Sequence, residues 1–172
     1  MTAAIVSPHP DDAEMAAGGL ILAERPTIVV LANCGRERRA ESEAAAAELG
    51  VPVLFVNAGM DGSLHQTARV QAEVDEALAP FSVVYGPHPM DWHQDHRVAA
   101  HLTVAATRRT KAASWLYGAA SCYERAYPDL IVPLPPDPGP ILRALRHHRS
   151  QSLYSAPLDA RLWRVGPRYV PG

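Results

Sequence analysis

Short apolar runs alternate with longer amphipathic or alanine-rich stretches along most of the chain. The apolar runs predict buried strands at residues 3–6, 27–31, 53–56, 82–85 and 115–117. The stretches between them predict helices over residues 13–24, 37–49, 66–79 and 96–109. Strands that alternate with helices of this length are typical of βαβ units. The pattern therefore predicts an α/β fold, with a mostly parallel sheet flanked by helices in one Rossmann-like domain over residues 1–172.

The last third of the chain has a weaker pattern. Residues 126–140 contain six prolines and are interpreted as an extended connection, because proline fixes the backbone and removes a hydrogen-bond donor. The last twenty residues are expected to be irregular coil packed on the domain.

Composition narrows the class of protein. A net charge of −2 and the lack of a basic run give no attraction to nucleic acid or to an anionic membrane surface. No apolar stretch approaches the ~20 residues that span a bilayer, and the first residues lack a signal-peptide pattern. Cys34 and Cys122 are far apart, which indicates free thiols in a reducing compartment. We expect a cytoplasmic protein with no nucleic-acid or membrane partner; a homo-oligomer remains open.

Two polar segments each follow a predicted strand. His9-Pro10-Asp11-Asp12 follows the first strand, and a segment with three histidines and two aspartates in nine residues, His88 to His96, follows the fourth. The carboxyl ends of parallel strands meet at one edge of a sheet, so these segments are expected to lie together. Imidazole and carboxylate suit zinc, which keeps one position for water in catalytic sites. The alternatives are an aspartate that only caps the first helix and a histidine-rich surface loop.

Together these segments resemble the motifs of the PIG-L/LmbE-like family of zinc-dependent N-deacetylases. The family's His-Pro-Asp-Asp loop and glycine pair appear as residues 9–12 with Gly18-Gly19, and its His-x-Asp-His motif appears as residues 93–96. A longer form of the second motif, similar to that of the branch acting on GlcNAc-linked small metabolites, is matched from Pro87 to His96. Weaker similarities are Arg38 to Glu41 followed by residues 49–51, Asp61-Gly62, and His148 to Gln151.

The resemblance implies a role for each residue of the two motifs. His9, Asp12 and His96 are the expected ligands of Zn²⁺, or of another divalent transition metal in its place. Asp11 is the expected general base, which takes the proton of the attacking water and delivers it to the departing amine. His93 is expected to stabilise the oxyanion, and Asp95 to orient a histidine from outside the ligand shell.

The same resemblance implies a hydrolase that removes an acetyl group from the nitrogen of a small amino-sugar-type substrate, such as a GlcNAc conjugate. Asn33, Arg36 and Asp91 are candidate substrate-binding residues, although exposed loop polarity explains Asn33 and Arg36 as well, and a role in shaping the loop explains Asp91 as well. Rival functions are a metal-dependent hydrolase of another amide or ester in natural-product metabolism and a metal phosphoesterase. A dinucleotide-binding protein lacks support, because no GxGxxG follows the first strand. A catalytically inactive binding module is disfavoured by the intact Asp11 and ligand set.

Overall fold

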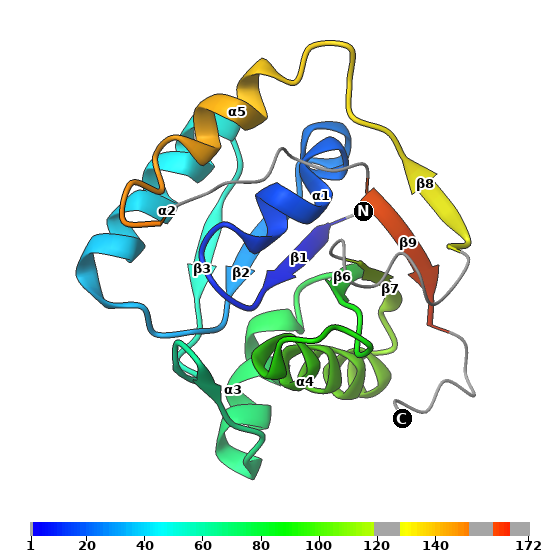
Figure 1. Cartoon of the computed structure of the whole chain (residues 1–172). Helices are drawn as coiled ribbons and strands as arrows, with labels where there is room; N and C mark the ends of the chain where they lie inside the picture. Colours follow the sequence, from blue (N-terminus) through cyan, green and yellow to red (C-terminus); the bar gives the residue numbers. More distant parts are fainter. Residues whose placement is uncertain (1, 119–127, 152–159, 166–172) are drawn as a thin grey trace.

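A seven-stranded sheet forms the centre of the molecule in the computed structural model, which describes residues 2–118, 128–151 and 160–165 (Figure 1). Its strand order is β3-β2-β1-β6-β7-β9-β8. The first five strands in this order pair in parallel, whereas β9 runs antiparallel to both β7 and β8. The strands of the sheet are β1 (Ala3–Ser7), β2 (Thr27–Val30), β3 (Val53–Phe55), β6 (Val83–Pro87), β7 (Ala113–Tyr117), β8 (Leu130–Val132) and β9 (Ala160–Arg164).

Helices cover both faces of this sheet. On one face lie α1 (Asp12–Glu24), α2 (Gly35–Leu49) and α5 (Gly139–Leu145), and on the other lie α3 (Ala68–Leu78) and α4 (Gln94–Thr110) (Figure 1). Successive residues of a strand point to opposite faces, so β1 contributes Ile5 to the first core and Ala4 and Val6 to the second. The expected α/β architecture, a mostly parallel sheet flanked by helices, is confirmed.

The order of the strands determines where a ligand binds. From β1 the chain proceeds through β2 to β3 on one side, and it then crosses to β6 and β7 on the other. The crevice between the carboxyl ends of β1 and β6 is therefore the switch point at which such sheets bind their ligands. The two polar segments singled out in the sequence are the ones that leave β1 and β6 at this point.

The glycine pair of α1 permits close packing. A Cβ atom on Gly19 would lie 2.5 Å from the backbone oxygen of Pro133, and one on Gly18 would lie 2.8 Å from the side chain of Ile141. Helix α1 thus approaches the segment before α5, and α5 itself, more closely than any larger residue allows. This packing fixes the helix whose first residue is Asp12.

Three expectations for the chain were wrong or incomplete. Residues 160–164, expected to be coil, form β9, because alternate residues Ala160 and Leu162 are buried against the sheet. The proline-rich stretch contains β8 and the first two residues of α5. This helix tolerates Pro140 in its first turn because the early backbone N–H groups need no partner within the helix. A short hairpin of β4 (Gly59–Met60) and β5 (Ser63–Leu64) had not been predicted.

No helix in the described part of the chain is long and apolar enough to cross a membrane. The cytoplasmic location stays a prediction, as does a free Cys122, which lies outside the described residues. Cys34 is a free cysteine.

Candidate metal centre

The loop between β1 and α1 carries the first donors. The Ser7 hydroxyl donates to the backbone oxygen of His9 over 2.6 Å and accepts the backbone N–H of Ala13 over 3.1 Å, which links the two ends of the loop. His9 also donates its backbone N–H to the Asp12 carboxylate over 2.9 Å. The loop is therefore held in a tight turn, with the His9 ring and the Asp12 carboxylate on the same side.

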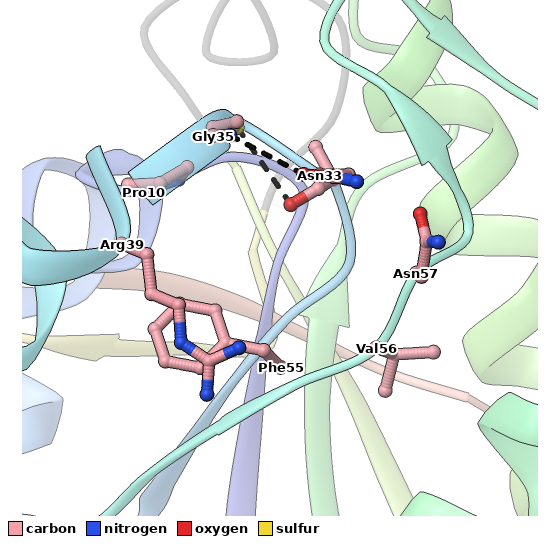
Figure 2. Close-up of a pocket in the computed structure, with 9 residues that line it drawn as sticks. Pro10, Asn33, Gly35, Arg39, Phe55, Val56 and Asn57 are labelled. Atoms are coloured by element: carbon pink, nitrogen blue, oxygen red, sulfur yellow. Dashed lines mark hydrogen bonds between the residues drawn. The ribbon is translucent and has the colours of Figure 1, made fainter. Parts of the chain in front are cut away.

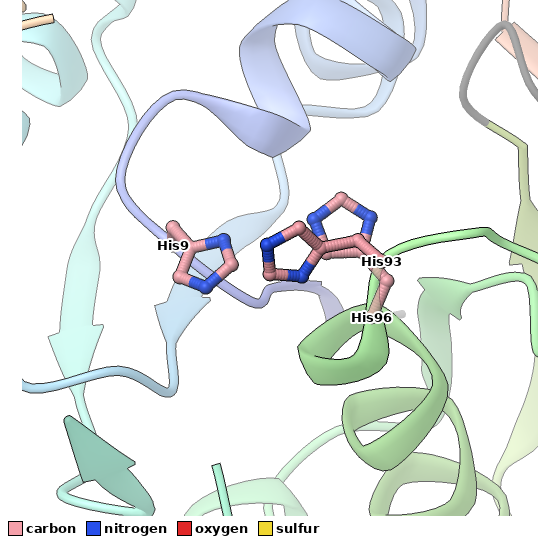
Figure 3. A group of neighbouring side chains, drawn as sticks. All are labelled: His9, His93 and His96. Atoms are coloured by element: carbon pink, nitrogen blue, oxygen red, sulfur yellow. The ribbon is translucent and has the colours of Figure 1, made fainter. Parts of the chain in front are cut away.

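One carboxylate oxygen lies between two imidazole rings. Asp12 Oδ2 is 3.0 Å from Nδ1 of His9 and 3.1 Å from Nε2 of His96, which lies in the first turn of α4. Zinc bonds to nitrogen and oxygen are about 2.0–2.2 Å long, so donor atoms in a tetrahedral site lie about 3.3 Å apart. Figure 3 shows the His9 ring, on the loop after β1, facing the rings of His93 and His96 at the start of α4. Two of the three donor pairs, His9–Asp12 and Asp12–His96, are therefore at about the spacing of zinc ligands.

The donors change one another's protonation in the absence of an ion. Burial would raise the pKa of Asp12, but His96 and His9 hold it well below its usual range. Burial would lower the pKa of His96, but Asp12 and Asp91 raise it to about 10. The cluster therefore contains an anion between rings that tend to be protonated, and a bound cation would take the place of those protons.

A second layer of carboxylates holds the two rings. Nε2 of His9 is 2.8 Å from Oδ2 of Asp95, and Nδ1 of His96 is 2.9 Å from Oδ2 of Asp91. Both aspartates are buried, and Asp95 also accepts the backbone N–H groups of Gly62 and Leu64. Carboxylates in this position fix the tautomer of a ligating histidine. Asp95 thus contacts a histidine as expected, and Asp91, expected at the substrate, directs its carboxylate to His96.

Other groups of possible ligands occur among the described residues. One combines His9 with Asp61 and Asp95, and another combines His9 with His93 and His96. The first requires Asp95, whose oxygens already accept two backbone N–H groups, and Asp61, which is 44% exposed and paired with Arg38. The set of His9, Asp12 and His96 stays a prediction; its carboxylate oxygen has one imidazole nitrogen at 3.0 Å and another at 3.1 Å.

Asp11 lies beside the donors but has a different environment. It is 7% exposed, and its closest cation is Arg38, whose Nη2 is 3.9 Å from Oδ1 of Asp11. Burial, reinforced by the negative charge of Asp12, raises the pKa of Asp11 to about 7. A carboxyl group with this pKa can both accept and return a proton near neutral pH.

His93 precedes α4 and caps it. Its Nδ1 accepts the backbone N–H of Asp95 over 3.2 Å, so the neutral ring carries its proton on Nε2. Burial, together with His96 and His9, lowers the pKa of His93. The ring centroids of His93 and His9 are 5.0 Å apart, which places a neutral N–H donor at the edge of the donor cluster (Figure 3).

The candidate substrate residues after β2 lie to one side of the donors. The Asn33 side chain accepts the backbone N–H of Gly35 over 3.3 Å. It lines a cavity of about 230 Å³, which extends to Pro10 in the loop between β1 and α1 (Figure 2). On the far wall of this cavity the Arg39 guanidinium lies 4.4 Å from the centre of the Phe55 ring. Arg36 is exposed in the first turn of α2. Substrate contact by Asn33, Arg36 or Asp91 stays a prediction.

Two features of the site were not predicted. Arg38 forms an ion pair with Asp61, and Oδ1 of Asp61 lies 3.3 Å from Nε2 of His9. Both residues belong to the weaker motif matches, which were the only sign in the sequence that they lie at the site. Glu14 and His148 form a buried pair 3.4 Å apart, at 1% and 2% exposure. This pair connects the first turn of α1 to the segment after α5, and its two charges act in opposite directions on the pKa of Asp11.

Comparison with known proteins adds a family and a set of similar folds. The model of the PIG-L family, described as GlcNAc-PI de-N-acetylase, matches residues 4–107. No curated protein sequence matches the chain.

Solved structures with the same fold have low identity to the chain. A deacetylase triple mutant (Orf2*T) of the teicoplanin biosynthetic pathway is 14% identical over 95% of this chain and 97% of its own, with a TM-score of 0.80. N,N'-diacetylchitobiose deacetylase from Pyrococcus horikoshii is 18% identical over 95% of this chain and 83% of its own, with a TM-score of 0.76. GalB, the 4-carboxy-2-hydroxymuconate hydratase from Pseudomonas putida KT2440, is 18% identical over 100% and 99%, also with a TM-score of 0.76. At these identities the likeness shows the fold alone.

Proposed function

The chain belongs to the PIG-L family, and we propose that it is a zinc-dependent deacetylase that removes the acetyl group from the nitrogen of a small amino-sugar-type substrate. GlcNAc conjugates are the substrate class that the family description favours. Two of the similar structures are deacetylases associated with sugar or glycopeptide substrates, which agrees with this choice.

The position of the Asp12 carboxylate between His9 and His96, beside a buried Asp11, is the observation that carries the proposal. His9, Asp12 and His96 would hold the ion, with Asp95 and Asp91 orienting the two rings. When bound, a zinc ion supplies Lewis-acid chemistry: it makes a water molecule acidic, with a pKa of about 7, and polarises the acyl carbonyl.

Asp11 moves the proton. Its carboxylate accepts a proton from the attacking water as the new carbon–oxygen bond forms, and the resulting carboxylic acid returns that proton to the nitrogen as the carbon–nitrogen bond breaks. The products are a carboxylic acid and a free amine. A pKa near 7 for Asp11 suits both halves of this cycle.

His93 stabilises the charge that develops on the acyl oxygen. Its Nε2–H is available because Nδ1 is engaged by the helix it caps. The neutral ring is sufficient for this role, so protonated His93 is not required and activity should have no alkaline limb from this residue.

The test is amine release from a panel of N-acetylated amino sugars, both free and conjugated, with zinc-loaded protein. We expect turnover of at least one conjugate, loss of turnover in Asp11→Asn, and loss of bound zinc in His96→Ala measured by elemental analysis. His65→Ala, at an exposed histidine outside the cluster, is the matched control. Absence of amine release from every member of the panel by the zinc-loaded protein would refute the proposal.

The same panel includes the rival reactions. Esters, other amides and phosphate monoesters test the hydrolase alternatives, and an unsaturated hydroxy acid tests water addition, the reaction named for GalB. A phosphoesterase usually requires two ions. The alternative ligand group of His9, Asp61 and Asp95 shares His9 with the proposed set of His9, Asp12 and His96, so the two groups do not supply separate ligands for two ions.

A further inference from the structure

A large aromatic side chain is exposed at the edge of the metal centre. Trp92, in the segment between β6 and α4, is 75% exposed, and Met90 in the same segment is 45% exposed. Burial of apolar side chains of this size is favourable, so an exposed pair beside a reaction centre suggests a ligand that covers it.

The segment that carries these side chains is well held. Nη1 of Arg97 donates to the backbone oxygens of Asp91 and Trp92 over 3.0 and 2.6 Å. Asp91 in turn accepts the backbone N–H of His93 over 2.9 Å, and Met90 donates its backbone N–H to Nδ1 of His88 over 3.2 Å. The backbone under Trp92 and Met90 is thus fixed, so that a ligand would meet a surface that is already in place.

Trp92 is separated from the metal donors by one ring. The centroids of Trp92 and His93 lie 5.4 Å apart with the rings edge to face, and the His93 centroid lies 5.0 Å from that of His96. In the proposed reaction His93 faces the acyl oxygen. A substituent that extends outward from the acyl carbon along this side would pass over Trp92.

A charged pair of side chains borders the metal donors on the side of α2. There Arg38 and Asp61 form an ion pair, and Arg38 also donates to the backbone oxygen of Pro10 over 3.2 Å. An N-acylated amino sugar has one polar substituent on its amide, the sugar, and one apolar substituent, the acyl group. The charged pair suits the sugar, which leaves the Trp92–Met90 surface for the acyl group.

From this match, and resting on the proposed function, we infer that Trp92 and Met90 form an acyl-chain subsite, so that the enzyme removes acetyl groups but also hydrolyses longer N-acyl groups, and faster than acetyl. Burial of one methylene contributes about 0.8 kcal/mol, which corresponds to about fourfold in kcat/KM when the group is fully covered. On a surface open to solvent on one side, we expect about two- to fourfold per methylene, from acetyl to hexanoyl.

The experiment measures kcat/KM for N-acetyl-, N-butyryl- and N-hexanoylglucosamine and their conjugates with zinc-loaded protein. The wild-type ratio of hexanoyl to acetyl should exceed ten, should fall to near one in Trp92→Ala, and should be largely restored in Trp92→Phe. The ratio cancels any effect of the substitution on His93, since that effect applies to every chain length. Ile131→Ala, at another exposed apolar residue on β8, should leave the ratio unchanged.

Three outcomes would overturn the inference: a wild-type preference for acetyl, a chain-length dependence that survives in Trp92→Ala, or a dependence that follows the alkyl chain of a hexyl glycoside instead of the acyl chain. Binding to zinc-loaded Asp11→Asn, measured by calorimetry, separates this result from a failure of the proposed function. Without turnover of any substrate, tighter binding of N-hexanoyl- than N-acetylglucosamine that depends on Trp92 still supports the subsite, and equal binding refutes it.

Discussion

Zinc affinity should rise steeply with pH, because the metal has to displace a proton from His96. In the metal-free protein Asp12 and Asp91 raise the pKa of His96 to about 10, against the loss of solvation. At pH 7 the ring is therefore protonated in all but about one molecule in a thousand. A difference of three pH units corresponds to about 4 kcal/mol of binding free energy, at about 1.36 kcal/mol per unit. A raised pKa opposes metal binding below pH 10, so this cost shrinks as the pH increases.

The dissociation constant for zinc, measured with a chelator buffer, should fall at least tenfold per pH unit between pH 7.5 and 9. Against burial, Asp12 and Asp95 also raise the pKa of His9, so a proton on that ring would add to the slope. Asp11, with a pKa of about 7, is already mostly ionised in this window and adds little to the slope. Calorimetry in buffers of different ionisation enthalpy should detect the release of at least one proton per zinc. Asp91→Asn should flatten the slope because it removes a carboxylate that holds the proton on His96, whereas His65→Ala should not. A dissociation constant that changes less than threefold across the window would show that His96 is neutral before the metal binds.

Four other substitutions test separate parts of the structure. Asp11→Asn should keep zinc and lose about 10²–10⁴ in rate, whereas Asp12→Asn should lose zinc itself; the reverse pattern in elemental analysis would exchange their roles. His93→Ala should lower kcat by about 10²–10³ with zinc content and KM little changed, and near-normal turnover would remove it from the mechanism. Gly19→Ala should lower the free energy of unfolding in urea by about 1–3 kcal/mol, because its Cβ would meet the backbone oxygen of Pro133 at 2.5 Å. An unchanged unfolding midpoint would show that α1 can shift freely.

The parallel part of the fold was predictable from the sequence because its pattern is local. Each buried strand is a short apolar run, and each helix between strands has its own periodicity, so their alternation alone predicts βαβ units. Strand β9 lacks such a signal, since its five residues include two arginines and its pairing with β7 depends on residues nearly fifty positions earlier. Helix α5 was not predicted, because the prolines around its start favour extended chain in general, although proline is tolerated in the first turn of a helix.

The site was predictable in part for a similar reason. The meeting of the two polar segments follows from the topology, because both follow parallel strands at the switch point. Which nitrogen of a histidine faces which carboxylate depends on the positions of side chains after packing, and spacing carries no such information. Asp91 illustrates the limit: its position in the motif placed it at the site, but only the structure shows its carboxylate on His96.

The different environments of Asp11 and Asp12 have a single origin in the backbone. Asp11 has a φ of 94°, in a region that residues other than glycine rarely adopt and that costs about 1–3 kcal/mol. Asp12 follows it as the first residue of α1, and its carboxylate lies between His9 and His96, whereas the Asp11 carboxylate has Arg38 at 3.9 Å as its closest cation. Both groups lose solvation, but only Asp12 gains two imidazoles, so the pKa of Asp12 falls and that of Asp11 rises. Neighbouring carboxyl groups whose pKa values are driven apart in this way are suited to separate roles, one as a ligand and one as a base. The strained turn at Asp11 is therefore the feature that supports the proposed division between them.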